Sequence, residues 1–177
     1  MSFPDVFARL IAILEKHEAR FVVIGVFGAN YYAGSASGLF TTLDRDLFLP
    51  KDPSNLLATW RSCEESGLEL FAGREPLDYP RDLDLARRVV GVSASTRASD
   101  GRVLDVDLSL TMTGFDFDTV WVSKREFEVA GTRVPVARLS HIVSSKAATG
   151  RPKDQSFLSS HAEILRRLVA EDESEVD

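Results

Sequence analysis

Two segments of the chain, 41–49 and 102–110, each carry two aspartates that are two residues apart. The first segment contains Asp44 and Asp46, and the second contains Asp105 and Asp107. Because alternate side chains of a β-strand point to opposite faces, both members of each pair project from the same face. The pattern therefore predicts two strands of a sheet in which one polar face carries paired carboxylates.

The surrounding sequence predicts further strands. The continuous apolar run 21–25, which ends at Gly25, is typical of a buried central strand. The turn residues 99–101 predict that 89–96 and 102–110 form an antiparallel hairpin. A second hairpin is predicted over 127–136, and a short strand is predicted at 68–71.

Helical periodicity and capping residues alternate with these strands. Helices are predicted at 5–19, 27–33, 53–65, 140–149 and 155–170, with a helical turn at 81–88 and a loop at 34–38. We expect an α/β (α+β) fold, a small mixed β-sheet with helices packed on one face.

Length and composition indicate one domain over residues 1–170, followed by an acidic flexible tail over 171–177. The chain has 177 residues, of which 44% are hydrophobic, and 11 are Phe; this excludes a wholly disordered protein. The formal net charge of -6 argues against a basic protein that coats nucleic acid. Five of the 27 acidic residues lie in the last seven positions, however, so residues 1–170 carry 22 acidic against 21 basic residues. This near-neutral charge of residues 1–170 is compatible with a local basic surface that binds a polyanionic substrate.

The cellular location is expected to be cytoplasmic. Apolar runs are far shorter than the ~20 residues that a membrane span needs, and residues 1–5 lack the basic start of a signal peptide. The single cysteine, Cys63, cannot form an internal disulfide and favours a reducing compartment.

The paired aspartates suggest a metal site. Neighbouring carboxylates repel each other unless a cation lies between them, and Mg²⁺ favours such oxygen ligands together with water and substrate phosphate. If the two strands are neighbours, one aspartate of the later pair completes a cluster of three carboxylates, which can hold two Mg²⁺ ions about 3.5 to 4 Å apart. A single Asp-x-Asp motif is also common on the solvent-exposed face of an ordinary strand. The metal-site hypothesis therefore depends on the presence of two such motifs in two predicted strands.

Four segments resemble the DNA polymerase beta-like nucleotidyltransferase superfamily, especially the minimal nucleotidyltransferases that include abortive-infection type toxins. The segments are VVIGVFGA at 22–29, TLDRDL at 42–47, DLSLTMTG at 107–114 and SKAATGRPKD at 145–154. Their order and spacing extend the resemblance from residue 21 to about residue 168. It implies a nucleotidyltransferase fold and a metal-dependent enzyme that uses Mg²⁺ (or Mn²⁺) and an NTP such as ATP.

The resemblance also implies roles for individual residues. Asp44 and Asp46 would bind the metals, and Asp107, preferred over Asp105, would be the third carboxylate. The implied nucleotide-binding residues are Gly25, Gly28, Lys146, Arg151, Lys153 and Asp154.

The acceptor is left open between alternatives. A toxin-like enzyme would transfer NMP to RNA, tRNA or protein, with a possible antitoxin partner, and would have a basic surface beside the site. A small-molecule (antibiotic) nucleotidyltransferase would have an acidic pocket for a cationic drug. A catalytically degenerate protein that binds a nucleotide or a partner is a third alternative.

Overall fold

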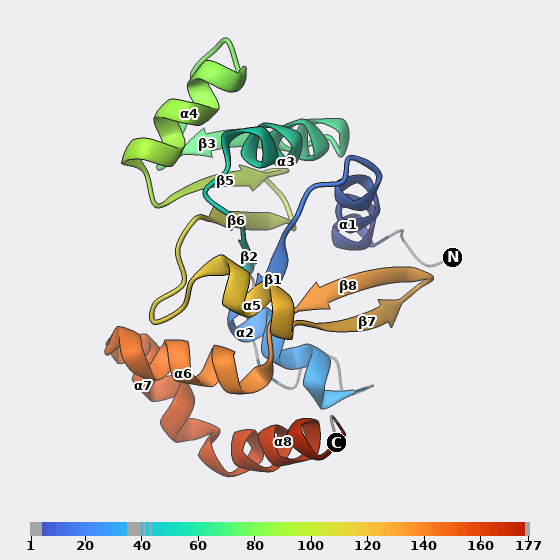
Figure 1. Ribbon diagram of the computed structural model, residues 1–177, viewed down its shortest axis with the longest axis vertical. Coiled ribbons are helices and arrows are strands. Elements are labelled where there is room, and N and C mark those ends of the chain that lie inside the picture. Colours follow the sequence, from blue (N-terminus) through green and yellow to red (C-terminus); the bar gives the residue numbers. More distant parts are fainter. Residues whose placement is uncertain (1–4, 35–39, 41, 43, 176–177) are drawn as a thin grey trace.

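The computed structural model describes residues 5–34, 40, 42 and 44–175, and its centre is a mixed sheet (Figure 1). The strand order is β4-β3-β5-β6-β2-β1-β8-β7. The strands are β1 (Val22–Ile24), β2 (Asp44–Phe48), β3 (Glu69–Ala72), β4 (Glu75–Pro76), β5 (Ser95–Ser99), β6 (Asp105–Ser109), β7 (Arg125–Val129) and β8 (Thr132–Val136). The helices are α1 (Val6–Lys16), α2 (Gly25–Asn30), the 3₁₀ helix η1 (Tyr31–Ala33), α3 (Pro53–Glu65), α4 (Leu83–Val92), α5 (Phe117–Ser123), α6 (Leu139–Thr149), α7 (Pro152–Ser160) and α8 (Ala162–Glu175).

Two parallel strand pairs interrupt an otherwise antiparallel sheet. Strand β2 pairs in parallel with β6, and β1 pairs in parallel with β8. The remaining neighbours are antiparallel, including the predicted hairpins β5–β6 and β7–β8. The parallel β2–β6 pair places the two aspartate-bearing strands side by side at the middle of the sheet.

Side-chain caps explain where several helices begin. Asp5 accepts a hydrogen bond from the Phe7 amide at 3.0 Å at the start of α1, and Asp82 accepts one from the Leu85 amide at 3.0 Å at the start of α4. Asp52 caps α3, and Pro53 occupies its first turn, where a missing amide hydrogen costs nothing. These short-range signals fix the helix starts that the sequence predicts.

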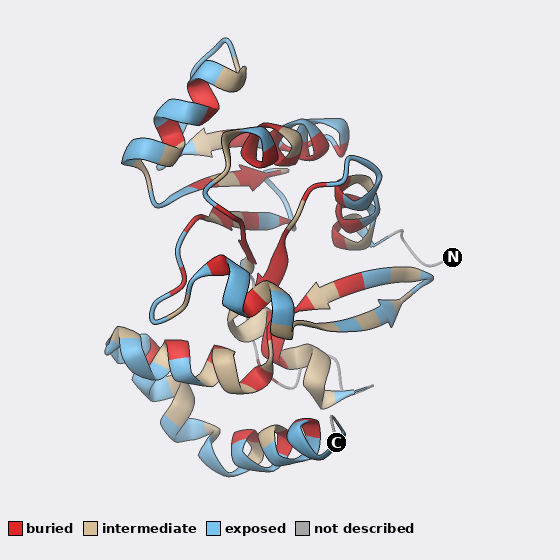
Figure 2. Ribbon diagram, viewed as in Figure 1, coloured by how far each residue is buried: buried red, intermediate tan, exposed pale blue. Residues whose placement is uncertain are grey.

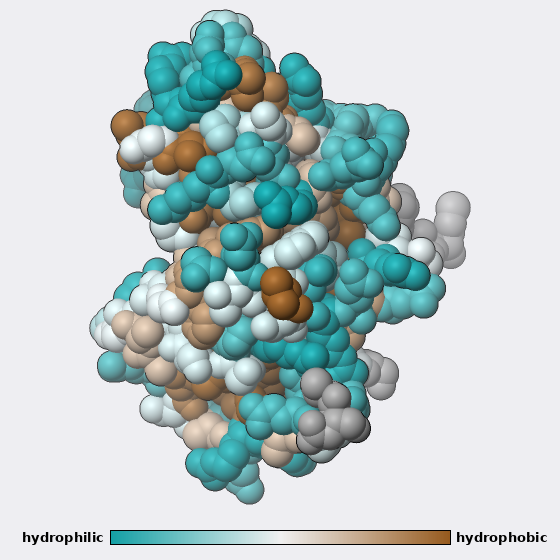
Figure 3. All heavy atoms as spheres, in the orientation of Figure 1, coloured by the Kyte–Doolittle hydropathy of each residue, from teal (hydrophilic) through white to brown (hydrophobic). Residues whose placement is uncertain are grey.

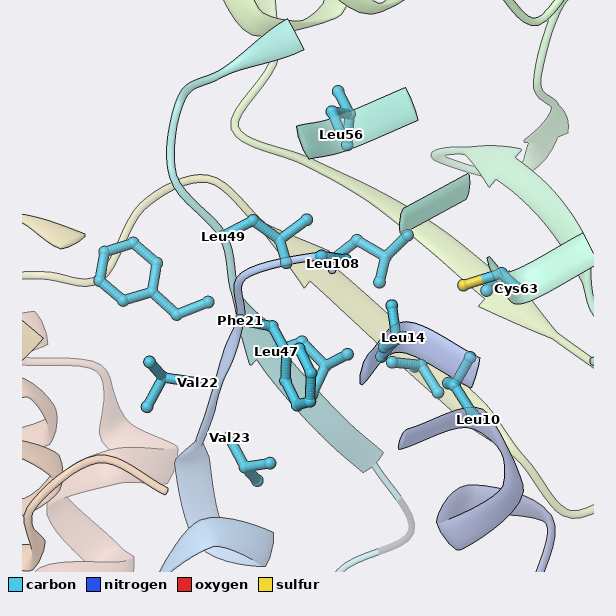
Figure 4. Close-up of a cluster of buried hydrophobic side chains, with 14 of the residues drawn as sticks. Leu10, Leu14, Phe21, Val22, Val23, Leu47, Leu49, Leu56, Cys63 and Leu108 are labelled. Carbon is cyan, nitrogen blue, oxygen red and sulfur yellow. The ribbon is translucent and has the colours of Figure 1, made fainter. Parts of the chain in front are cut away.

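One face of the sheet is covered by α1 and α3. Leu10 and Leu14 of α1 and Leu47 of β2 belong to the same apolar core (Figure 4), and the buried residues concentrate around the central strands (Figure 2). Trp60 of α3 is fully buried and donates its indole N–H to the Thr96 hydroxyl of β5 at 3.1 Å. The carboxylates of β2 and β6 point to the opposite face.

That opposite face also carries helices, so the expectation of helices on one face is wrong. Phe117 of α5 packs edge-on against Phe48 of β2, with ring centroids 5.4 Å apart. Ile142 of α6 is buried in the same core. The helices on this face surround the carboxylates rather than covering them.

Two predicted elements differ from the structure. Residues 89–92, expected in a strand, belong to α4, because the Asp82 cap begins a helix whose residues Leu85, Ala86 and Val89 are buried. The predicted helix 155–170 is two helices, α7 and α8, which are separated at His161. The predicted loop 34–38 lies outside the described residues beyond residue 34.

The acidic end of the chain is helical as far as Glu175, which corrects the expectation of a flexible tail from residue 171. Asp172 is only 4% exposed, and its carboxylate accepts hydrogen bonds from Arg125 at 2.7 Å and from Arg138 at 2.8 Å. These two arginines, which the sequence pattern does not connect to residue 172, neutralise the carboxylate and attach α8 to the sheet. Figure 1 shows α8 beside α6 at one end of the molecule.

Within the described ranges, no helix combines the length and apolar character needed to cross a bilayer. The face seen in Figure 3 is mostly hydrophilic, with brown, apolar atoms in small separate groups.

Candidate functional site

The register of β2 and β6 brings the two Asp-x-Asp pairs together. Asp44 lies opposite Asp105, and Asp46 lies opposite Asp107. Because directly paired residues of neighbouring strands point to the same face, all four carboxylates share one face of the sheet. The structure thus produces the juxtaposition that the sequence hypothesis requires.

The carboxyl groups of Asp46 and Asp107 interact directly with each other. Burial of Asp46, the charge of Asp107 and a hydrogen bond that the protonated Asp46 carboxyl donates to Asp107 together raise the pKa of Asp46 to about 7. The charge of Asp44 also raises this pKa, whereas the positive charge of Lys146 lowers it. The negative charges of Asp44, Asp46 and Asp107 therefore exceed the positive charge that the neighbouring Lys146 supplies.

The two aspartates of β6 differ in their surroundings. Asp105 accepts a hydrogen bond from Arg97 of β5 at 3.0 Å and is largely exposed. Asp107 lines a cavity together with Asp44 and Asp46, whereas Asp105 does not. This difference supports the choice of Asp107 over Asp105 as the third carboxylate.

The cavity has a volume of about 1100 Å³ and is open to solvent. Its walls come from β2, β5, β6, the start of α2, the segment after β6, and helices α6 and α7. Of the nine site residues predicted from the sequence, eight line it: Gly25, Asp44, Asp46, Asp107, Lys146, Arg151, Lys153 and Asp154.

The two predicted glycines have different surroundings. Gly25 has a φ of +75°, and a β-carbon there would collide with the carboxylate of Asp46, so only glycine leaves that carboxylate in place. Gly28 is buried, and a β-carbon would contact Ile142 of α6 and the Val23 carbonyl at 3.2 Å. Gly28 does not line the cavity, and its neighbours place it at the packing contact between α2, β1 and α6, so its predicted contact with nucleotide stays a prediction.

Asp154 organises the basic side of the cavity. Its carboxylate is almost fully buried and accepts hydrogen bonds from Thr149 at 2.6 Å, Arg151 at 2.9 Å and Lys146 at 3.2 Å. Burial acts to raise the pKa of Asp154, but the hydrogen bonds from Thr149 and Lys146 outweigh it and lower the pKa. Asp154 is thus a charged anchor for these side chains, and its own oxygens are occupied.

Lys146 interacts both with Asp154 and with Asp46 of β2. Its ammonium group bonds to Asp154, lies 5.3 Å from the centre of the Phe157 ring and acts electrostatically on Asp46. Lys153, in contrast, is exposed, and its ammonium group is 4.0 Å from an oxygen of Asp44. Positive charge therefore borders the aspartate cluster on the side of α6 and α7.

The donor set fits a magnesium ion. Within the part of the chain that the structure describes, no three His, Cys, Asp or Glu side chains form a ready metal cage. Mg²⁺ in phosphate-transferring sites, however, is commonly held by one or two carboxylates and completes its shell with water and substrate oxygens. Asp46 and Asp107, with Asp44 beside them, supply such oxygens, and their mutual repulsion is what a divalent cation would relieve.

Several residues that line the cavity were not predicted from the sequence. They are mostly hydroxyl side chains, with one aromatic and one imidazole ring: Ser95, Ser109, Thr111, Thr113, Ser160, Phe157 and His161. Side chains alternate along β6, so Ser109 lies on the same face as Asp107. The sequence alone could have predicted this position for Ser109. No sequence signal identified Phe157 and His161, whose rings pack on each other at 4.9 Å and on Phe40 at 5.3 and 5.0 Å, respectively.

Comparison with known proteins gives a similarity in fold. No protein-family model and no curated protein matches the chain. Among solved structures, the chain is similar to the antibiotic-resistance factor ANT(2'')-Ia, with a TM-score of 0.52 and 18% sequence identity. The match covers 97% of this chain and 91% of that chain. The chain therefore shares its mixed α/β fold with that structure, which agrees with the fold that the resemblance implied.

Proposed function

We propose that the protein is a metal-dependent nucleotidyltransferase, which moves a nucleoside monophosphate from an NTP to a hydroxyl group of an acceptor. One observation carries the proposal: the register of β2 and β6 sets Asp46 against Asp107 in a cavity that also contains Lys146. The fold shared with ANT(2'')-Ia supports the same class of reaction.

Asp44, Asp46 and Asp107 would hold the magnesium. Bound there, Mg²⁺ supplies positive charge to the transferring phosphate and to the pyrophosphate leaving group. Gly25 keeps the space beside the Asp46 carboxylate free of a side chain. Lys146 and Arg151, both fixed by Asp154, bind the triphosphate and orient it toward the carboxylates.

The reaction forms one bond and breaks one bond. The acceptor oxygen bonds to the α-phosphorus, the bond from that phosphorus to the oxygen bridging to the β-phosphate breaks, and pyrophosphate leaves with the electron pair. Asp107 accepts the proton that the acceptor hydroxyl loses, as a general base. Most of the rate enhancement comes from positioning and from charge neutralisation, as is usual for transfer of phosphate groups.

A matched pair of variants tests the proposal. Transfer of label from each α-³²P NTP, with Mg²⁺, is measured to a mixture of cellular metabolites and total RNA. We expect Asp107→Asn to reduce transfer about 10²- to 10⁴-fold, because it removes both a metal ligand and the base. Asp105→Asn, on the same strand but bonded to Arg97, is the control and should stay within about twofold of the wild type. Equal activity of the two variants contradicts the assignment, and metal-independent transfer contradicts the mechanism.

A further inference from the structure

We propose that the acceptor is a small, uncharged molecule rich in hydroxyl groups. This inference rests on the proposed nucleotidyl transfer and concerns only the molecule that receives the nucleotide. It follows from the charges of the cavity, most of which are already engaged by neighbouring residues or needed for the NTP and its metal.

The carboxylates of the cavity are all in use. The acidic side chains among its described lining residues are Asp44, Asp46, Asp107 and Asp154, and no glutamate is among them. The first three are the proposed metal ligands. Asp154 is saturated by Lys146, Thr149 and Arg151. No described carboxylate of the cavity is thus left for an ammonium group of the acceptor.

The sequence between Gly34 and Asp44 adds no carboxylate to that count. The residues of this segment that the structure does not describe are Ser35, Ala36, Ser37, Gly38, Leu39, Thr41 and Leu43, none of which is charged. A polycationic acceptor would therefore enter a cavity in which no described carboxylate remains to pair with its ammonium groups.

The cations of the cavity are also assigned. Lys146 lies near Asp46, Lys153 lies near Asp44, and Arg151 is bonded to Asp154, so all three lie with the residues that would bind the NTP and metal. A nucleic-acid acceptor needs an additional series of lysines and arginines for its phosphates. The described lining contains no other lysine or arginine for them.

Hydroxyl groups occupy the wall beyond Asp107. Ser109 follows Asp107 on the same face of β6, and Ser95 lies directly opposite it on β5. Thr111 and Thr113 continue this wall in the segment after β6. Each hydroxyl can donate one hydrogen bond and accept others, which suits the hydroxyls of an uncharged polyol or sugar.

The size of the cavity is consistent with two small ligands. Pockets for single drug-sized ligands commonly occupy about 300 to 1000 Å³. The cavity of about 1100 Å³ can hold a nucleotide and a second compact molecule together. A small acceptor would thus lie between the hydroxyl wall and the carboxylates.

The first experiment identifies the charge class of the acceptor. Cellular metabolites are separated by ion exchange into neutral, cationic and anionic fractions, and each fraction, as well as total RNA and total protein, is incubated with α-³²P NTP, Mg²⁺ and the enzyme. We expect the neutral fraction to receive most of the label. Labelling mainly of another fraction, of RNA or of protein overturns the proposal, as does labelling of nothing while NTP binding still requires Mg²⁺.

Binding of NTP separates this outcome from failure of the proposed function. Isothermal titration with each NTP is performed with and without Mg²⁺. If no NTP binds in a Mg²⁺-dependent manner, the nucleotidyl transfer itself is wrong, and the acceptor assignment falls with it.

The second experiment changes the charge of the wall. Thr111 and Thr113 are exposed, so the double variant Thr111→Asp/Thr113→Asp should fold, which circular dichroism checks. Kanamycin, which carries several ammonium groups, should bind the variant about tenfold more tightly than the wild type. Fully N-acetylated kanamycin, which keeps hydroxyls but lacks these charges, should not distinguish the two proteins. Equal and tight binding of kanamycin to both proteins contradicts the charge argument.

Discussion

Asp46 and Asp172 are both shielded carboxylates, but their surroundings are opposite. Asp172 in α8 accepts hydrogen bonds from two arginines, Arg125 and Arg138. Asp46 in β2 faces Asp107 and Asp44 and has Lys146 as a cation nearby, and its pKa is raised to about 7. Negative charge is thus balanced at one carboxylate and accumulated at the other.

The difference separates a structural carboxylate from a functional one. A carboxylate with two arginine partners joins elements of the fold, and removing a partner leaves a charge without compensation. A group of carboxylates that the protein itself does not neutralise destabilises the fold and is retained where a bound cation or a reaction uses it. Changing each carboxylate in turn should therefore produce opposite effects on stability.

The largest expected effect is the loss of activity in Asp46→Asn. Nucleotidyl transfer should fall about 10²- to 10⁴-fold, because a metal ligand is lost. The free energy of unfolding at pH 8 should nevertheless rise by about 1 to 3 kcal/mol, since the variant removes the burial of a charge and the repulsion from Asp107, which together raise the pKa of Asp46. Label transfer and urea denaturation measure the two effects. A variant that is both less active and less stable contradicts the comparison.

Asp172→Ala should act in the opposite way. We expect the free energy of unfolding to fall by about 3 kcal/mol, because Arg125 and Arg138 lose their shared partner. The control is Glu175→Ala, which removes the exposed second partner of Arg125 and should cost about 1 kcal/mol or less. Urea denaturation of the three proteins tests this, and similar losses in both variants would show that burial of Asp172 is unimportant.

The pH dependence of stability isolates Asp46. Its pKa is about 7 in the folded protein and near 3.8 in the unfolded chain, so the folded state holds more protons between these values. The stabilisation relative to Asp46→Asn should therefore be present below about pH 4 and decline as the pH rises to about 7, by about 1 to 3 kcal/mol in total. Thermal unfolding across this range measures it. Addition of Mg²⁺ at pH 8 should raise the melting temperature of the wild type but not of Asp46→Asn.

The smallest effect is expected at Asp154, a balanced carboxylate that lies beside the unbalanced group. Asp154→Asn should weaken NTP binding about tenfold with little change in kcat, since Lys146 and Arg151 lose their anchor but keep their charges. Steady-state kinetics separate KM from kcat. Asp154→Glu, which retains the charge, should recover part of the affinity; no recovery would mean that the geometry of Thr149 and Arg151 matters more than the charge.

Local patterns predicted much of the fold. Helix α3 was predicted at its observed limits because Asp52 and Pro53 mark its start and Gly67 follows its end. The two hairpins were predicted from their turn residues, although β5 begins at Ser95, well after the predicted start. Residues 89–92 were predicted as strand because their β-branched side chains suit a strand, whereas burial against α3 and the Asp82 cap favour α4.

Long-range partners explain what the sequence could not provide. Alternation placed Asp44 and Asp46 on one face, but only the β2–β6 register shows that Asp46 meets Asp107. The partners of Asp172 lie 47 and 34 positions earlier, so its charge looked solvent-exposed in sequence. Gly28 was assigned to nucleotide because of its place in a motif, whereas its contacts are with Ile142 and Val23.

The contact between Gly25 and Asp46 also provides a way to sort other sequences of this fold. A β-carbon at position 25 would collide with a carboxylate oxygen of Asp46 and displace that carboxylate. A mutation at that single codon would therefore disable the site while every acidic residue remained in the gene. Searches for inactive descendants should examine the glycine that follows the first strand before counting aspartates.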